Sequence, residues 1–164
     1  LPTAVVAQDC WMGIMFDGED GLVDTVEPTE LALDAHLVLD TTAAAVSGYE
    51  AGITISNPAV FVLGVITPPG WVNFGTALNQ LVAFSEPLPA GGTVVLCTLQ
   101  LLLTGGPGTE LCVVAVEPSS FEPPAPGFWD GGGDPHACEG RCGYITSPVG
   151  AEAYAFGAVK ALFD

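Results

Sequence analysis

Hydrophobic and polar residues alternate along several segments of this chain. In residues 31–40 every odd position is Leu or Ala, whereas Asp34, His36 and Asp40 occupy even positions. Residues 49–55 repeat the pattern after the turn residues Ser47 and Gly48. Because successive side chains of a strand point to opposite faces, both segments are predicted to be strands with one buried face.

Other segments are apolar throughout. Residues 60–66 carry no polar side chain and are predicted to form an interior strand, and residues 78–84 are predicted to follow as another. The clearest hairpin is predicted to join residues 93–103 to residues 110–116 through the Gly- and Pro-rich turn at 104–109. In that hairpin Leu101 would face Cys112.

The whole pattern predicts an all-β protein. About nine strands are separated by turns, beginning with residues 9–16 and ending with residues 144–146 and 153–163, and no amphipathic helix is evident. This favours a two-sheet antiparallel β-sandwich of immunoglobulin-like or jelly-roll type. At 16.7 kDa the chain fits one domain. We expect an N-terminal extension at 1–8 and a sandwich at 9–164, with a long Pro/Gly-rich loop at 118–143.

Part of the chain resembles a known family. The segment VSGYEAGITI at residues 46–55, followed by Asn-Pro-Ala-Val at 57–60 and Leu-Gly-Val at 63–65, is similar to the pattern V-x-G-[YF]-x-[FV]-x-[IL]-x-[YF]-[DN]-P-x-V-L of cohesins and related secreted sandwiches. This resemblance, within residues 32–103, implies a nine-stranded jelly-roll fold. Cohesins bind dockerins through calcium-dependent contacts, but no segment here matches a dockerin-binding face residue by residue. The resemblance therefore implies the fold and not the partner.

The two ends of the sequence point to secretion. Residues 155–163 resemble the ending T-W-G-x-[VI]-K-x-[LM]-[YF]-R of many secreted proteins of uncultured bacteria, with Asp164 in place of the terminal basic residue. The chain begins at Leu1 rather than Met, as expected after removal of a signal peptide. No apolar run approaches the roughly 20 residues of a membrane span. We expect a secreted protein, extracellular or at the cell surface, without membrane insertion.

Charge restricts the partners. Two Lys and Arg residues stand against nineteen Asp and Glu residues, which gives a net charge of −17, and yet mean hydropathy is +0.51. Such a chain repels phosphate backbones and anionic headgroups, so nucleic acid and acidic membranes are poor partners. The sequence contains no Gly-x-Ser-x-Gly elbow, His-Glu-x-x-His or phosphate loop and only two histidines, so we do not expect an enzyme.

Five cysteines in a secreted chain imply disulfides and one cysteine left over. Cys138 and Cys142 flank a three-residue loop and are predicted to form a local disulfide. The predicted hairpin register holds Cys97 and Cys112 too far apart to pair with each other. Either could pair with Cys10, which leaves the other as a buried thiol or as half of an intersubunit disulfide.

Two glycine-rich turns concentrate carboxylates. Calcium needs several oxygen ligands on flexible backbone, which makes each turn a candidate calcium site, although acidic residues also populate turns without any ligand. The residues are Asp17, Glu19, Asp20, Asp130 and Asp134. A zinc site built from His136, Cys138, Cys142 and Asp134 is a less favoured alternative in an oxidising compartment.

Two functions remain open. The first is a structural subunit of an extracellular bacterial filament or surface assembly, in which the N-terminal residues add as a strand to a neighbouring copy rather than to their own sheet. The second is a cohesin-like or carbohydrate-binding module for a protein or glycan ligand, with Trp129 as the candidate aromatic that stacks on the ligand. The residues of the assembly strand are Leu1, Pro2, Thr3, Ala4, Val5, Val6, Ala7 and Gln8.

Overall fold

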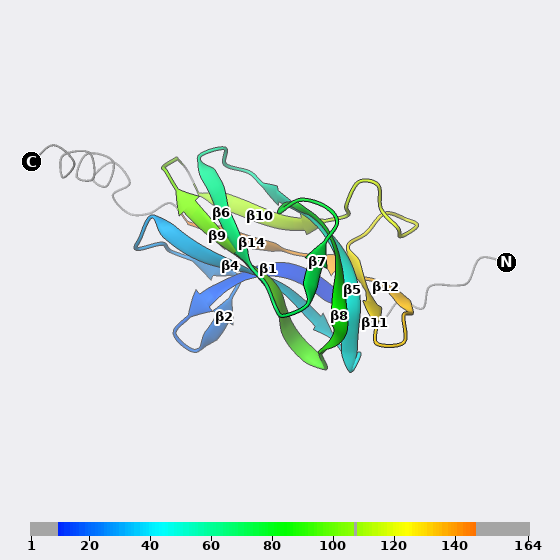
Figure 1. Cartoon of the computed structure of the whole chain (residues 1–164). Coiled ribbons are helices and arrows are strands. Elements are labelled where there is room, and N and C mark those ends of the chain that lie inside the picture. The colour runs from blue at the N-terminus through cyan, green and yellow to red at the C-terminus, as the bar shows by residue number, and fades with distance from the viewer. Residues whose placement is uncertain (1–9, 107, 147–164) are drawn as a thin grey trace, which may run out of the picture.

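In the computed structural model of this chain, residues 10–106 and 108–146 are described, and they form strands and connecting loops (Figure 1). The strands make two sheets that pack face to face, which confirms the predicted all-β sandwich. Among the described residues there is no helix with the length and hydrophobicity that a membrane span requires.

The first sheet contains six strands. They are β1 (Trp11–Gly18), β2 (Gly21–Val23), β4 (Ala32–Thr41), β6 (Val60–Ile66), β9 (Gly92–Leu103) and β13 (Glu139–Gly140). The order is β13-β1-β4-β9-β6, and β2 pairs with one end of β1. The pairing of β1 with β13 is parallel, and the others are antiparallel.

The second sheet is built around one long strand. Its members are β3 (Thr25–Val26), β5 (Ala45–Ile55), β7 (Trp71–Asn73), β8 (Asn79–Pro89), β10 (Thr109–Val114), β11 (Gly127–Asp130), β12 (Pro135–Ala137) and β14 (Cys142–Ile145). The antiparallel partner β8 lies along one side of β5, while β11 and β10 follow each other along its other side. Outside β8 lies β7, which therefore forms that edge of the sheet.

Alternation along the strands supplies the core between the two sheets. Inward residues of both sheets are fully buried, and each large aliphatic or aromatic side chain removed from water contributes roughly 1.5–3 kcal/mol. The largest of them are Tyr49, Phe16, Phe128, Met12, Ile14, Leu37, Leu39, Leu96, Leu99, Leu101 and Leu111. Of the odd residues in the 31–40 segment, Ala35, Leu37 and Leu39 are buried and Leu33 is half-buried, as the sequence predicts, whereas Leu31 precedes β4 and is exposed.

The predicted hairpin between residues 93–103 and 110–116 is wrong. Strand β9 pairs with β4 and β6 in the first sheet, whereas β10 pairs with β5 and β14 in the second. The connection between them therefore crosses from one sheet to the other. Two apolar strands joined by Gly and Pro have the same sequence pattern in a hairpin and in a corner between sheets, so the pattern alone does not separate the two.

Strand β6 has the bounds predicted for it but lies at the edge of the first sheet, not in its interior. Among the described residues it pairs only with β9. Phe61, Leu63 and Ile66 are 52%, 63% and 52% exposed. An apolar run on both faces is normally read as an interior strand, and here it marks an exposed edge instead.

The long loop predicted at 118–143 is partly wrong, because β11, β12 and β13 lie within it. The longest irregular stretch is residues 115–126, which cross the outer face of β5. Ser119 Oγ and Ser120 N donate to Oε1 of the fully buried Glu50 at 2.8 and 2.9 Å. Residues 1–8 and the strand predicted at 153–163 fall outside the described residues, so the N-terminal extension remains a prediction.

The predicted local disulfide between Cys138 and Cys142 is wrong. The bonds are Cys10–Cys138 and Cys112–Cys142, and Cys97 is a buried free thiol. Strand β13 lies beside β1, and Glu139 N donates to Cys10 O, which brings Cys138 to Cys10. Strand β14 lies beside β10, where Cys142 directly faces Cys112. Cys138 and Cys142 are close in the sequence, but their disulfides therefore lie in different sheets. Cys10 pairs with neither Cys97 nor Cys112.

Candidate protein-binding surface

One long segment of the chain carries no charged residue. Residues 51–85 contain no Asp, Glu, Lys, Arg or His, although the whole chain has nineteen acidic residues. This window includes β6 at the edge of the first sheet and β7 at the edge of the second. A four-residue turn at 67–70 spans at most about 17 Å, so the two edges lie on the same flank (Figure 1).

The same window exposes large apolar side chains. Of the ten large hydrophobic residues that are exposed in the described part of the chain, six lie within residues 51–85. They are Phe61, Leu63, Ile66, Val72, Phe74 and Leu81. Single exposed hydrophobic residues are ordinary on protein surfaces, but neighbouring ones on a single face are typical of an interaction site.

Register places part of this cluster on the outer face of the second sheet. Trp71 points into the core, so Val72 points outward on the same strand. Phe74 N donates to Leu81 O at 2.8 Å, which sets these two residues side by side on that face. Val114 of β10 lies opposite Gly52 of β5 and joins the same face. We call Val72, Phe74, Leu81 and Val114 the outer apolar face.

A hydrogen-bonded turn fixes the most exposed of these residues. Asn73 Oδ1 accepts from the amides of Gly75 and Leu81 at 2.9 and 3.0 Å, and its Nδ2 donates to Thr76 O at 2.9 Å. Phe74 lies between these contacts with 72% of its surface exposed. The backbone that carries Phe74 is therefore fixed on both sides, which lowers the entropy cost of ordering this turn in a contact with a partner.

A buried polar network anchors the strands beneath the outer apolar face. Trp71 Nε1 donates to Tyr49 Oη at 3.0 Å, and Tyr49 Oη donates to Gln80 Oε1 at 2.6 Å. Gln80 Nε2 donates to Ala77 O at 2.8 Å, and the Cys97 thiol lies 3.5 Å from the Gln80 amide. Burial raises the pKa of both Tyr49 and Cys97, so both groups stay protonated. The network joins β5, β7, β8 and β9 without any charge.

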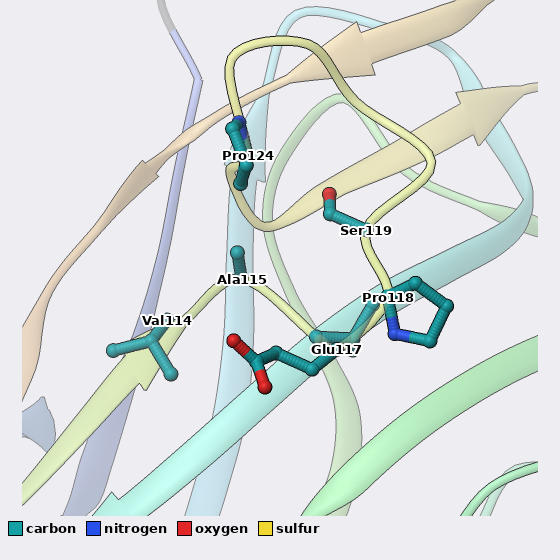
Figure 2. A pocket seen from close by; sticks show the side chains of 7 residues that line it. Val114, Ala115, Glu117, Pro118, Ser119 and Pro124 are labelled. Carbon is teal, nitrogen blue, oxygen red and sulfur yellow. The ribbon is translucent and has the colours of Figure 1, made fainter.

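A hollow of about 860 Å³ adjoins Val114 at the end of the outer apolar face (Figure 2). The loop after β10 forms most of its wall, and Pro124 comes from the later part of the same loop. The lining residues are Val114, Ala115, Val116, Glu117, Pro118, Ser119 and Pro124. Glu117 carries the one charged group among them, and all the others except Ser119 are apolar. The hollow therefore suits a side chain of a partner that is mostly apolar.

The candidate calcium residues lie on two separate turns, one around residues 17–21 and one at residues 130–134. Asp130 Oδ1 accepts from the amides of Gly132 and Asp134, and Asp130 Oδ2 lies 2.9 Å from His136 Nε2. The hydrogen bond with His136, followed by that from the Asp134 amide, lowers the pKa of Asp130. In the other turn Asp17 Oδ1 lies 3.2 Å from His36 Nε2. Glu19 and Asp20 are exposed there. Calcium binding stays a prediction.

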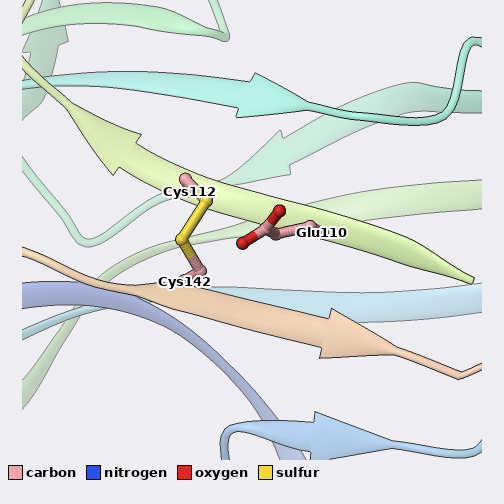
Figure 3. A group of neighbouring side chains, drawn as sticks. All are labelled: Glu110, Cys112 and Cys142. Atoms are coloured by element: carbon pink, nitrogen blue, oxygen red, sulfur yellow. A yellow bond between two sulfur atoms is a disulfide. The ribbon is translucent and has the colours of Figure 1, made fainter.

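The described residues contain one group of three metal-type side chains, Glu110, Cys112 and Cys142 (Figure 3). The two cysteines form a disulfide, so neither offers a thiolate to a metal ion. Cys138 is likewise oxidised, which removes two ligands from the alternative zinc site.

Trp129 is half-buried in β11, and its ring centroid lies 5.5 Å from that of Phe121. Its role as a ligand-stacking residue stays a prediction.

Sequence reasoning missed the outer apolar face, although the uncharged window at 51–85 was the signal that could have revealed it.

The two sheets of the sandwich allow a comparison with proteins of known structure. No protein-family model and no curated protein matches the sequence. Solved structures do match, and they are cohesin modules, which confirms the cohesin-like fold that the sequence resemblance implied.

Three of these structures are similar over most of the chain. A cohesin module from a family 33 glycoside hydrolase of Clostridium perfringens has 12% identity and a TM-score of 0.61, over 87% of this chain and 98% of that one. A non-cellulosomal cohesin from the archaeon Archaeoglobus fulgidus has 10% identity and a TM-score of 0.54, over 92% and 98%. The third ScaB cohesin of R. flavefaciens, in complex with a group 1 dockerin, has 12% identity and a TM-score of 0.56, over 88% and 99%. At these identities the likeness shows the fold alone.

Proposed function

We propose that this chain is a cohesin-like binding module that recognises a small protein domain through its outer apolar face. Similar solved structures support a protein ligand. Cohesins from R. flavefaciens and from Acetivibrio cellulolyticus scaffoldin B were each solved in complex with a dockerin. We infer a dockerin-like domain as the ligand, and a binding role rather than a catalytic one.

The observation that carries this proposal is the exposure of Phe74 on its fixed turn. An aromatic residue that is exposed on a preorganised backbone and becomes buried on binding is a common centre of an interface. Val72 and Leu81 flank it and would exclude water around the contact. The partner surface should be apolar and neutral at this point, and basic groups at its rim would favour approach to a chain of net charge −17.

The proposed location is extracellular or at the cell surface. Two disulfides connect strands that are far apart in the sequence, and such bonds persist in oxidising compartments. Glycan recognition through Trp129 has less support, because that ring is half-buried and packs against Phe121. A filament subunit with a donated strand at 1–8 rests on residues outside the described part of the chain.

A binding experiment with purified dockerins tests the proposal. The probes are the two dockerins named in the similar complexes, measured by calorimetry with calcium and with a chelator. We expect binding of at least one probe, and a loss of at least 100-fold in affinity in Phe74→Glu. Leu63→Glu is the matched control, because it places the same charge on an exposed residue of the other sheet.

Two results would contradict the proposal. Absence of binding by either dockerin would overturn a dockerin-like ligand. Binding that Phe74→Glu leaves unchanged would overturn the outer apolar face as the site.

A further inference from the structure

The hollow beside Val114 lies close to the turn that carries Phe74. Gly52 of β5 pairs with Val114 on one side and with Asn79 on the other, so Val114 and Asn79 are two strand spacings apart, about 10 Å. Asn79 begins β8 directly after the turn. Its Oδ1 accepts from Glu117 N at 3.4 Å, and its Nδ2 donates to Glu117 O at 3.5 Å. Asn79 therefore links the turn to the wall of the hollow, and a partner seated on Phe74 would reach both.

The wall of the hollow is held at a second point by the buried Glu50. Its Oε1 accepts from Ser119 Oγ and Ser120 N, and Ser119 Oγ in turn accepts from Phe121 N at 3.1 Å. Ser119 thus lines the hollow and contacts Glu50 behind it. Because the loop is fixed at two points, the hollow is preorganised, and a partner would pay little entropy to order it.

The hollow contains a carboxylate that lacks a partner. Figure 2 shows the carboxylate of Glu117 between the side chains of Val114 and Pro118. Glu117 is exposed, and within residues 10–106 and 108–146 none of the three ion pairs involves it. Its hydrogen bonds with Asn79 use the backbone alone. The carboxylate is therefore available to a positive group from another molecule.

A second carboxyl group lies behind the wall. Glu50 is fully buried, and its Oε2 has no hydrogen-bond partner. In the described part of the chain Arg141 is the one Lys or Arg residue, and its guanidinium contacts Glu139 at 3.3 Å. A buried polar atom without a partner is costly, and a positive charge in the hollow, beyond Ser119, would stabilise it. Glu50 therefore adds to the preference of the hollow for a cation.

The rest of the lining decides which cation fits. A metal ion needs several oxygen ligands, whereas the hollow offers one carboxylate and one hydroxyl among valine, alanine and proline side chains. A basic side chain fits better, because its stem is apolar and only its end is charged. Arginine is favoured over lysine, since the planar guanidinium can donate two hydrogen bonds to one carboxylate and is more weakly hydrated than an ammonium group.

We propose that the hollow is a subsite for an arginine side chain of the protein partner. The guanidinium pairs with the carboxylate of Glu117, and the aliphatic stem packs against Val114, Pro118 and Pro124. This deepens the proposed function and rests on it for the nature of the partner, which would contact Phe74 at the same time. The outer apolar face supplies buried area, and the arginine subsite selects among partners that share an apolar surface.

Titration of the full chain with N-acetyl-arginine amide at low salt, followed by NMR of valine and alanine methyl groups, tests the subsite. We expect saturable shifts for Val114 and Ala115, with an affinity that falls as salt is added. The neutral N-acetyl-citrulline amide has nearly the same shape and should bind about fivefold more weakly. Glu117→Gln should weaken arginine binding by about the same factor. The matched control is Glu122→Gln, which removes an exposed carboxylate of the same loop outside the hollow and should leave binding unchanged.

Three results would overturn the proposal. They are the absence of saturable shifts, citrulline binding as tight as arginine binding, and equal effects of Glu117→Gln and Glu122→Gln, which would attribute the attraction to the general acidity of the chain. The probe contains no protein partner, so this test is separate from that of the proposed function. Arginine binding by a chain that binds neither dockerin would refute the dockerin-like ligand and support the subsite. Dockerin binding without arginine binding would refute the subsite alone.

Discussion

The buried hydroxyl of Tyr49 links two other polar groups in the core, and its removal gives a quantitative test of the fold. In Tyr49→Phe the ring and its packing stay, but Gln80 Oε1 keeps only the weak contact with the Cys97 thiol, and Trp71 Nε1 loses its acceptor. An unsatisfied buried polar group costs about 1–3 kcal/mol. Trp71 is only half-buried, so its unsatisfied indole N–H costs less than the unsatisfied Gln80 Oε1. Adding the two costs, we expect Tyr49→Phe to lower the free energy of unfolding by about 2–4 kcal/mol.

The assay is urea unfolding with disulfides intact, followed by tryptophan fluorescence. With a slope of about 2 kcal/mol per molar urea, the midpoint should fall by about 1–2 M. Tyr144→Phe is the control, because it removes the same hydroxyl from an exposed residue and should change stability by less than about 0.5 kcal/mol. The double variant with Gln80→Leu should lose less than the sum of the single changes, because it removes both partners together. A Tyr49→Phe midpoint equal to that of Tyr144→Phe would refute this reasoning.

Three further outcomes are expected. The Cys97 thiol is buried and its pKa is raised, so a thiol reagent at pH 8 should find no reactive group in the folded protein and one after unfolding in urea. Cleavage after Glu139 without reduction should leave Cys142 linked to the peptide of Cys112 in mass spectrometry; a peptide linking Cys142 to Cys138 would contradict this pairing. The folded pKa of Asp130 is lowered, so its stabilising contribution is present above its ordinary pKa of about 3.9 and is lost as pH falls through the folded value. The stability difference from Asp130→Asn should therefore shrink between pH 5 and pH 2 in urea titrations.

The sequence predicts strands well where one face is buried. The pattern of residues 31–40 gives both the strand and its inward residues, because burial of a single face imposes a period of two on the sequence. It fails for β6, since an exposed edge that carries apolar residues has the same composition as an interior strand. Pairing between strands is also beyond the pattern, as β9 and β10 show by joining different sheets. Only long-range geometry decides which strands become neighbours.

The disulfides show the same limit. Spacing along the chain favours a bond between Cys138 and Cys142, but each of these residues lies on a strand whose neighbour is set by the sheet order. The bonds to Cys10 and Cys112 span 128 and 30 residues. Cysteine count and compartment are readable from the sequence, whereas connectivity requires the fold.

Charge supplied information that the hydrophobic pattern did not. Alternation alone puts Glu50 outward on β5, and it is outward, but the loop at residues 115–126 covers it and its carboxylate is fully buried. Directly after Glu50 the chain runs to Ser85 without a charge, and this window forms the flank where Phe74 and Leu63 are exposed. In a chain of net charge −17, an uncharged segment with exposed apolar residues is where a contact with another molecule costs the least charge desolvation. Phe74 lies on the outer face of the second sheet and Leu63 on the edge of the first, so the Phe74→Glu and Leu63→Glu variants distinguish binding at the proposed face from an effect of charge elsewhere in this segment.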